Sequence, residues 1–219
     1  MRDRNAPLSA SDIASLAWNK MDGMLPAVVE DRRSGRLLML GYMNPEALAA
    51  TLETGLVTFY SRSKQRLWQK GESSGNVLRL VSVHEDCDGD ALLVTADPDG
   101  PTCHLGTTSC FGGELSGPGW LAELSSIIAD RATSGGESSY TRKLLDAGIE
   151  RIAQKIGEEG TEVALAAVTR DASGCAEEAA DLLYHLGVLM EAKGFGWNEV
   201  VAVLKQRHAA RASSSTTSS

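Results

Sequence analysis

The chain changes character at one short stretch, Gly112-Gly113-Glu114-Leu115-Ser116-Gly117-Pro118-Gly119. Runs rich in β-branched and aromatic residues precede it, whereas no convincing strand follows it. A segment so rich in Gly and Pro favours a linker. We therefore expect an α+β multidomain chain, with a mainly-β domain with short helices over residues 1–114 and an all-α helical bundle over 115–211. The Ser/Thr-rich residues 212–219 have nothing to bury, which predicts a disordered tail.

The overall composition narrows the class of protein. Of the 219 residues, 42% are hydrophobic and 23% charged, which is typical of a soluble globular protein. A net charge of −8 argues against wholesale binding to nucleic acid or acidic membranes. No apolar run approaches the roughly 20 residues that span a bilayer, and the start has no apolar signal region. Four cysteines without tight pairing fit reduced thiols, so we expect a cytoplasmic protein.

Periodicity and turn residues predict the elements of the first half. Residues 25–30 and 36–43 indicate two strands of a hairpin, with a turn at Ser34-Gly35. Asn44 and Pro45 predict a helix start, and Gly55 predicts its end. Residues 56–61, 77–83 and 91–96 are three further β-rich runs.

The segment between the first two of these runs, residues 62–75, carries four basic residues in an acidic protein. Its glycine and serine backbone amides, together with nearby Arg and Lys, could hold a phosphate. A solvated hairpin loop has the same composition, so both interpretations stay open.

The next stretch alternates acid and cysteine: Asp86-Cys87-Asp88-Gly89-Asp90. If it is extended, its pleat places the three aspartates on one face and Cys87 on the other. Carboxylate oxygens suit Mg²⁺ or Ca²⁺, and a thiolate suits Zn²⁺. The EF-hand pattern fails here, because Ala91 and Asp97 stand where that loop requires Gly and Glu.

Two more cysteines, Cys103 and Cys110, could join Cys87 around a metal, and His104 follows Cys103 directly. Their wide spacing lacks the Cys-x₂₋₄-Cys pairs of structural zinc, but three thiolates leave a fourth position open for water, as in catalytic zinc. His104 would then be a neighbouring base. Buried cysteines without metal remain the alternative.

After the linker, helical periodicity marks stretches near 120–128, 140–147, 149–170, 175–193 and 197–204. Two acid pairs stand out on them: Glu159 with Glu162, and Glu178 with Asp181. Each pair lies at i, i+3 on one helix face. On facing helices they would make a Mg²⁺ site for a polyphosphate, with Arg151 and Lys155 upstream. A solvated acidic face is the alternative.

The motif runs of the first half resemble phosphoribosyl-AMP cyclohydrolase. These runs are Gly41-Tyr42-Met43-Asn44, Phe59-Tyr60-Ser61-Arg62, residues 67–75, residues 86–90, Pro101-Thr102-Cys103-His104 and Ser109-Cys110-Phe111. The second half resembles phosphoribosyl-ATP pyrophosphohydrolase, of the all-α NTP pyrophosphatase superfamily. The matching runs there are Ser139-Tyr140-Thr141, residues 151–159, Glu162, Glu178 and Asp181-Leu182-Leu183-Tyr184-His185. Together they resemble the bifunctional fusion enzyme of histidine biosynthesis, over residues 16–208.

This resemblance implies two consecutive reactions. The second domain would cleave phosphoribosyl-ATP to phosphoribosyl-AMP and pyrophosphate. Its Mg²⁺ would be held by Glu159, Glu162, Glu178 and Asp181. Glu159, Glu162 and Lys155 would be catalytic, and Arg151 and Lys155 would neutralise phosphate charge.

The first domain would then hydrolyse the N1–C6 bond of the adenine ring. Zinc on Cys87, Cys103 and Cys110 would activate water while His104 moves protons. Mg²⁺ on Asp86, Asp88 and Asp90 would help to hold the nucleotide. The expected substrate-binding residues of the chain are Arg62, Lys70, Glu72, Ser73, Ser74 and Arg151. The resemblance also implies a homodimer with cyclohydrolase sites at the subunit interface.

Two other interpretations of the sequence are carried alongside. One is an NTP pyrophosphatase fused to a zinc-dependent nucleotide deaminase-like domain, although Pro101-Thr102-Cys103-His104 does not supply the deaminase motif. The other is a non-enzymatic module with structural zinc and a helical dimerisation bundle.

Overall fold

The structure is a computed structural model that describes residues 3–113, 115, 117–134, 136 and 139–215, the last five by their backbone only. The chain divides into two compact units, Met1–Ser116 and Gly117–Ser219. The first unit is built around β-strands and the second is helical, so the predicted fold class is confirmed. In the described part of the chain, no helix combines the length and the apolar character needed to cross a membrane.

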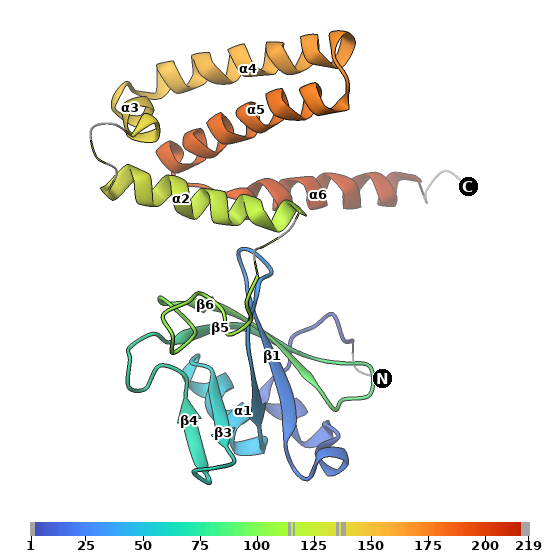
Figure 1. The fold of residues 1–219 in the computed structure, drawn as a ribbon. Coiled ribbons are helices and arrows are strands. Elements are labelled where there is room, and N and C mark those ends of the chain that lie inside the picture. The colour runs from blue at the N-terminus through green and yellow to red at the C-terminus, as the bar shows by residue number, and fades with distance from the viewer. Residues whose placement is uncertain (1–2, 114, 116, 135, 137–138, 216–219) are drawn as a thin grey trace. The chain divides into compact units, whose positions relative to one another are not determined.

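The first unit is centred on a four-stranded sheet of order β2-β1-β6-β5 (Figure 1). Strands β1 (Leu25–Asp31) and β2 (Leu37–Met43) form the predicted antiparallel hairpin, and β5 (Leu78–Glu85) pairs antiparallel with β6 (Leu92–Pro98). The two hairpins join through a parallel pairing of β1 with β6. The candidate site lies on the turn between β5 and β6 and on the loop that follows β6, which is hydrogen-bonded to the outer strand β2.

A second, two-stranded sheet of β3 (Thr58–Ser61) and β4 (Arg66–Gln69) belongs to the same unit. We expected residues 62–75 to be loop, and β4 shows that this expectation was wrong for four of them. Phe59 stacks on Trp68 across the pair, with ring centroids 5.7 Å apart. This aromatic pairing is a cross-strand contact that stabilises a short hairpin.

Helix α1 (Pro45–Thr54) follows the sequence signals closely. The side chain of Asn44 accepts a hydrogen bond from the amide of Ala47 at 2.9 Å, and Gly55 ends the helix with φ +69°. Two short 3₁₀ helices, η1 (Ala10–Ser15) and η2 (Trp18–Met21), precede the sheet. These short helices agree with the expected secondary structure of the first half.

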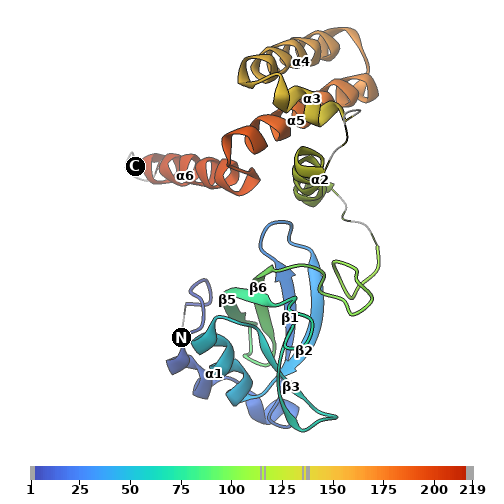
Figure 2. The same cartoon turned by 90° about the vertical axis from the view of Figure 1, so that its left-hand side faces the viewer.

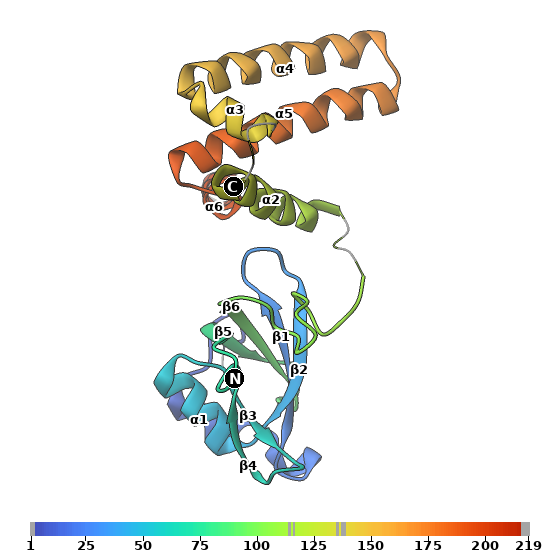
Figure 3. The same ribbon diagram turned by 60° about the vertical axis from the view of Figure 1, so that its left-hand side comes forward.

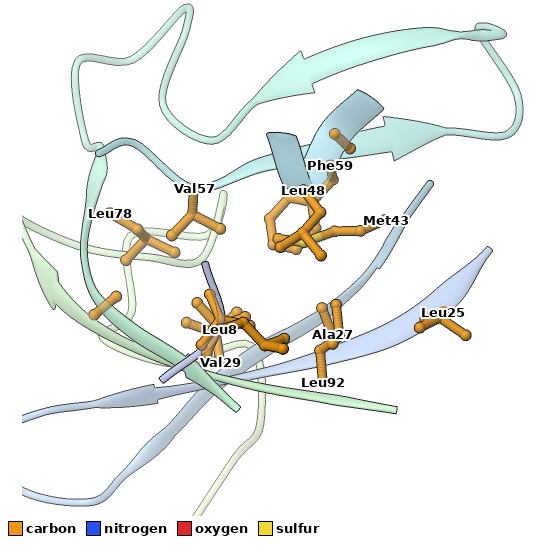
Figure 4. Packing of buried hydrophobic residues seen from close by; sticks show 14 of the residues in the cluster. Leu8, Leu25, Ala27, Val29, Met43, Leu48, Val57, Phe59, Leu78 and Leu92 are labelled. Atoms are coloured by element: carbon orange, nitrogen blue, oxygen red, sulfur yellow. The ribbon is translucent and has the colours of Figure 1, made fainter. Parts of the chain in front are cut away.

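The core of the first unit lies between the large sheet, α1 and the small sheet (Figure 4). Alternate residues of β1, namely Leu25, Ala27 and Val29, are fully buried, as the period of a strand requires. Phe59 and Leu48 cover them from β3 and α1. A Cβ on Gly41 would lie 2.3 Å from the Phe59 ring, so only glycine fits in β2 at that point.

The second unit contains η3 (Gly117–Gly119), α2 (Trp120–Ser134), α3 (Tyr140–Asp146), α4 (Ile149–Thr169), α5 (Ala172–Lys193) and α6 (Trp197–Ser215). Helices α4 and α5 form a long antiparallel pair that stays adjacent in all three views (Figures 2 and 3). Asp171 caps α5 by accepting from the amide of Gly174 at 3.0 Å. This helix pair brings the two predicted acid pairs face to face.

The core of the second unit is small. Its fully buried apolar cluster consists of Ile128, Leu144, Ile152 and Val188, one from each of α2 to α5. The indole of Trp197 donates to the carbonyl of Leu121 at 3.1 Å and ties α6 to α2. Helix α6 continues through Ser215, past the start of the predicted tail, and residues 216–219 lie outside the described ones.

Candidate active sites

The turn between β5 and β6 contains Asp86, Cys87, Asp88 and Asp90. It is not extended: the carboxylate of Asp86 accepts from the amides of Asp90 and Ala91 at 3.0 and 3.2 Å, and Gly89 has φ +73°. The expectation of aspartates and cysteine on opposite faces was therefore wrong. Asp86, Cys87 and Asp88 each offer one ligand atom, a carboxylate oxygen or the sulfur, and these three atoms lie within 4.8 Å of one another.

An internal cation already binds two of these aspartates. The Nζ atom of Lys20, from η2, lies 2.5 Å from Asp88 Oδ2 and 3.4 Å from Asp90 Oδ2. Its hydrogen bond lowers the pKa of Asp88 below the usual range of a carboxyl group. Sequence reasoning missed Lys20, because it is distant in the chain and belongs to no motif. A divalent ion on all three aspartates has to displace this ammonium group.

The other two candidate zinc ligands lie in a loop that is held against β2. The amide of Cys110 donates to the carbonyl of Leu38 at 2.8 Å, and the hydroxyl of Ser109 donates to that of Leu37 at 2.6 Å. Cys103 is buried, while Cys110 is exposed. The hydroxyl of Thr102 is buried and, within the described chain, has no hydrogen-bond partner.

The two thiols of this loop influence each other. The backbone N–H of Leu105 and the hydroxyl of Thr107 lower the pKa of Cys103. Burial and then the neighbouring Cys103 raise the pKa of Cys110. His104 Nδ1 lies 3.9 Å from Cys103 Sγ, within reach of the same loop. Among the described residues of this one chain, the three cysteines do not form a group with ligand atoms within 4.8 Å.

The predicted substrate-binding residues lie around the β3–β4 hairpin. Lys70 is only 8% exposed, and its charge acts on the Cys110 thiol, so it faces the cysteine loop. Its Nζ donates to the carbonyl of Asn76 at 3.2 Å. Glu72 is paired with Arg66 at 2.5 Å, which lowers the pKa of Glu72.

The other three predicted substrate-binding residues of this region are exposed. The guanidinium of Arg62 lies 4.2 Å from the centre of the Tyr42 ring, a cation–π contact. Ser74 Oγ accepts from the amide of Asn76 at 3.3 Å, and Ser73 is its neighbour in the same turn. This exposure leaves their polar atoms open to a solute.

In the helical unit, the predicted acid pairs meet. Glu159 of α4 and Glu178 and Asp181 of α5 each offer one carboxylate oxygen, and these three oxygens lie within 4.8 Å of one another. Glu162 is close by, since the negative charge of Glu159 raises its pKa, with burial and then the charge of Glu178 adding to the rise. This crowding of carboxylates fits a hard divalent cation, which prefers oxygen ligands and relieves the repulsion.

Basic side chains border these carboxylates. Lys155 Nζ lies 2.7 Å from Glu159 Oε1 and 2.9 Å from Glu158 Oε2, which raises the pKa of Lys155 and lowers that of Glu159. Arg170, at the end of α4, forms an ion pair with Glu178. Sequence reasoning missed Arg170, because this residue ends α4 at the turn into α5 and lies outside the sequence motifs. Arg151 lies 3.9 Å from Glu158 and is half exposed.

These features define a two-domain enzyme, with a thiol and aspartate site in one unit and a carboxylate site on a helix pair in the other. The phosphoribosyl-AMP cyclohydrolase family model matches residues 39–112, and the phosphoribosyl-ATP pyrophosphohydrolase model matches residues 121–208. The chain therefore contains both domains in the order that the sequence motifs indicated.

Curated relatives match both domains at once. The histidine biosynthesis bifunctional protein HisIE of Xanthomonas axonopodis is 55% identical over 93% of this chain and 98% of its own length. The HisIE protein of Escherichia coli is 53% identical over 88% and 95%, and that of Vibrio cholerae is 52% identical over 91% and 98%.

The chain belongs to this HisIE family of bifunctional histidine biosynthesis enzymes. Its first domain is a phosphoribosyl-AMP cyclohydrolase and its second a phosphoribosyl-ATP pyrophosphohydrolase. The resemblance stated from the motifs is confirmed. The deaminase-like fusion and the non-enzymatic module find no support in these comparisons.

Proposed function

We propose that the two sites act in sequence on one nucleotide, with the carboxylate site first. Water cleaves phosphoribosyl-ATP between its α and β phosphates, which leaves phosphoribosyl-AMP and pyrophosphate. Water then adds at C6 of the adenine ring, the N1–C6 bond breaks, and N1 takes up a proton. Both substrates are small anions, so each site needs positive charge in an acidic protein.

The observation that carries the first step is the group of carboxylates on α4 and α5. Glu159, Glu178 and Asp181 supply closely spaced oxygen ligands, and Glu162 adds a fourth at the same place. A Mg²⁺ ion bound there supplies charge to the phosphate oxygens and orients the attacking water.

Side chains around these ligands do the remaining work. Glu162, which lies beside these ligands, accepts the proton that the attacking water loses. Lys155 and Arg151 neutralise phosphate charge. Of these two, Lys155 lies closer to the ligands, 2.7 Å from Glu159.

For ring opening, Cys103 and Cys110 are the core of a zinc site. Their thiols lie close enough to shift each other's pKa, and Lys70 adds a positive charge. A zinc ion bound there supplies a Lewis acid that makes water a nucleophile near neutral pH. His104, next to Cys103, moves the protons. The exposed Arg62, Ser73 and Ser74 bind the phosphates, and Glu72 holds Arg66 beside them.

The third thiolate, Cys87, comes from a second copy of the chain. This proposal follows from the single-chain geometry, in which Cys87 groups with Asp86 and Asp88 and not, among the described residues, with Cys103 and Cys110. A homodimer places the β5–β6 turn of one subunit against the cysteine loop of the other. The aspartates of that turn then add a Mg²⁺ site beside the nucleotide, after Lys20 moves away. All four cysteines are free, which supports a reducing compartment, the cytoplasm.

Two substitutions test the division of labour. With phosphoribosyl-ATP supplied, Cys103→Ser should release pyrophosphate and accumulate phosphoribosyl-AMP. Glu159→Gln should release no pyrophosphate, yet open the ring of supplied phosphoribosyl-AMP. Cys175→Ser and Glu191→Gln, which lie outside both sites, are the matched controls. If either site variant lost both steps while folded, the two-site proposal would be wrong.

Mixing inactive subunits tests the shared zinc site. In a mixed dimer of Cys87→Ser and Cys103→Ser subunits, one site receives all three native thiols and the other receives two defects. Random exchange should therefore restore roughly one quarter of wild-type ring opening. If the mixture stays inactive after exchange is verified, each zinc site lies within one chain.

A further inference from the structure

His185 is a buried titratable side chain beside the carboxylate site, and the proposed mechanism does not use it. It lies in α5 and is 5% exposed. Its Nδ1 atom lies 2.8 Å from the backbone carbonyl of Asp181 and 3.7 Å from Glu159 Oε1. Its Nε2 atom lies 3.1 Å from the hydroxyl of Tyr140 in α3. The ring thus contacts the positions of two proposed metal ligands, one on each helix.

The partners of the ring fix its tautomer. A backbone carbonyl can only accept a hydrogen bond, so Nδ1 must carry a proton. In the neutral ring Nε2 is then the acceptor, and the hydroxyl of Tyr140 donates to it. Each nitrogen of the neutral ring therefore has one defined role. The Nδ1–H donates to the Asp181 carbonyl, and the Glu159 carboxylate lies beside the same nitrogen without a hydrogen bond to it.

Aromatic contacts hold the ring in this plane. Tyr140 and Tyr184 both meet His185 edge to face, with ring centroids 6.0 and 5.4 Å away. Tyr184 does not bind the imidazole nitrogens in the described contacts, because its hydroxyl pairs with that of Thr141 at 2.8 Å. The two tyrosines therefore pack alike around His185 but differ in their hydrogen bonds.

We propose that His185 is a positioning residue of the pyrophosphohydrolase site, which fixes the Asp181 backbone through Nδ1 and packs beside the Glu159 carboxylate, so that both ligands are in place for the cation, with Tyr140 fixing its tautomer. The inference rests on the proposed metal site. Partners of metal ligands commonly act in this way, by orienting the ligand before the ion arrives. Lys155 binds Glu159 through an ion pair, whereas His185 occupies the space between Glu159 and the backbone of α5.

Two substitutions of His185 separate its nitrogens. Asparagine places an amide nitrogen where Nδ1 lies and keeps its donor, but it loses the bond from Tyr140. Glutamine reaches the position of Nε2 and loses the Nδ1 donor. Tyr140→Phe removes the hydroxyl that binds Nε2. Tyr184→Phe is the matched control, since it removes one hydroxyl from the same cluster without touching the histidine bonds.

The readout is the affinity of the full chain for Mn²⁺, measured by titration of the free ion's EPR signal. The Mn²⁺ binding that is lost in Glu159→Gln is assigned to the helical site. This subtraction excludes Mn²⁺ that is bound elsewhere in the chain from the comparison. Far-UV circular dichroism of each variant confirms that the helices are intact. An equal signal in wild type and Glu159→Gln would overturn the proposed metal site, and this inference with it.

We expect His185→Gln to weaken Mn²⁺ binding by about 10- to 100-fold. Tyr140→Phe and His185→Asn should each weaken it by about threefold, the value of one neutral hydrogen bond. Their double variant should match either single one, since both remove the same bond. Tyr184→Phe should bind as wild type does. If His185→Gln stayed within about threefold of wild type, or Tyr184→Phe lost as much as Tyr140→Phe, His185 would have no positioning role.

Discussion

Replacing Lys155 with methionine should destabilise the helical unit in a pH-dependent way. Lys155 Nζ lies 2.7 Å from Glu159, in a pair whose side chains are 19% and 6% exposed. Removing one partner of a buried pair costs about 3 to 5 kcal/mol, and partial exposure of the lysine reduces this to about 2 kcal/mol. The second contact, to the 41% exposed Glu158, adds little.

The pH window follows from the two shifts. The pKa of Glu159 is lowered on folding, so its contribution is present above its usual pKa of about 4.3 and is lost as the pH falls through the lowered value. The pKa of Lys155 is raised on folding, so its contribution is present below about 10.4 and is lost as the pH rises through the raised value. The variant should therefore be less stable than wild type at pH 7, and the difference should shrink in acid.

Urea unfolding, followed by the helical signal in far-UV circular dichroism with a chelator present, measures this difference. Helices α2 to α6 of the second unit dominate that signal, because the described residues of the first unit contain a single α-helix, α1. Lys143→Met is the matched control, because Lys143 is exposed on α3. Equal stability of wild type and Lys155→Met at pH 7, or a difference that is unchanged in acid, would refute the reasoning.

Three further outcomes are expected. Gly71→Ala should impair ring opening and leave pyrophosphate release intact, as separate assays of the two products would show. Gly71 has φ +86°, and a Cβ there would lie 2.4 Å from the carbonyl oxygen of Asn76, the same oxygen that accepts a hydrogen bond from Lys70. Lys20→Met should strengthen Mn²⁺ binding by the β5–β6 turn, because it removes the ammonium group that competes for Asp88 and Asp90. Calorimetric titration with Mn²⁺ in a Glu159→Gln background measures this affinity. Gly41→Ala should destabilise the first unit by about 1 to 3 kcal/mol through overpacking against Phe59. Unfolding followed by tryptophan fluorescence measures this, since Phe59 stacks on Trp68, one of the four tryptophans.

Local signals in the sequence predicted the local structure well. The cap at Asn44, the stop at Gly55 and the β1–β2 hairpin follow from residues adjacent in the chain. Strand β4 escaped prediction because it is only four residues long, Arg66-Leu67-Trp68-Gln69, and these residues carry no apolar–polar alternation. What marks it as a strand is its pairing with β3, in which Trp68 lies opposite Phe59. The parallel pairing of β1 with β6 was likewise out of reach, since it joins segments far apart in the chain.

The candidate sites show the same division. Spacing at i, i+3 correctly predicted that Glu178 and Asp181 share a helix face, and the α4–α5 hairpin brings them to Glu159. The two-faced arrangement of Asp86 to Asp90 depended on an extended backbone, but the carboxylate of Asp86 binds the amides of Asp90 and Ala91 and closes a turn instead. Aspartate competes for backbone amides in this way, and alternation alone cannot reveal it.

In each acidic cluster, basic side chains offset the repulsion between the carboxylates. Lys20 and Arg170 lie outside the sequence motifs, whereas Lys155 lies within one and is also proposed to neutralise phosphate charge. Lys20 binds Asp88 and Asp90, Lys155 binds Glu159, and Arg170 binds Glu178. Without these partners the carboxylates would repel one another more strongly, and a cation would be the only group left to offset the repulsion. An ion bound at the proposed sites would have to displace these ammonium or guanidinium groups, and this competition would lower its affinity. The displaced basic groups would stay beside the site, where they could neutralise the phosphates of a nucleotide.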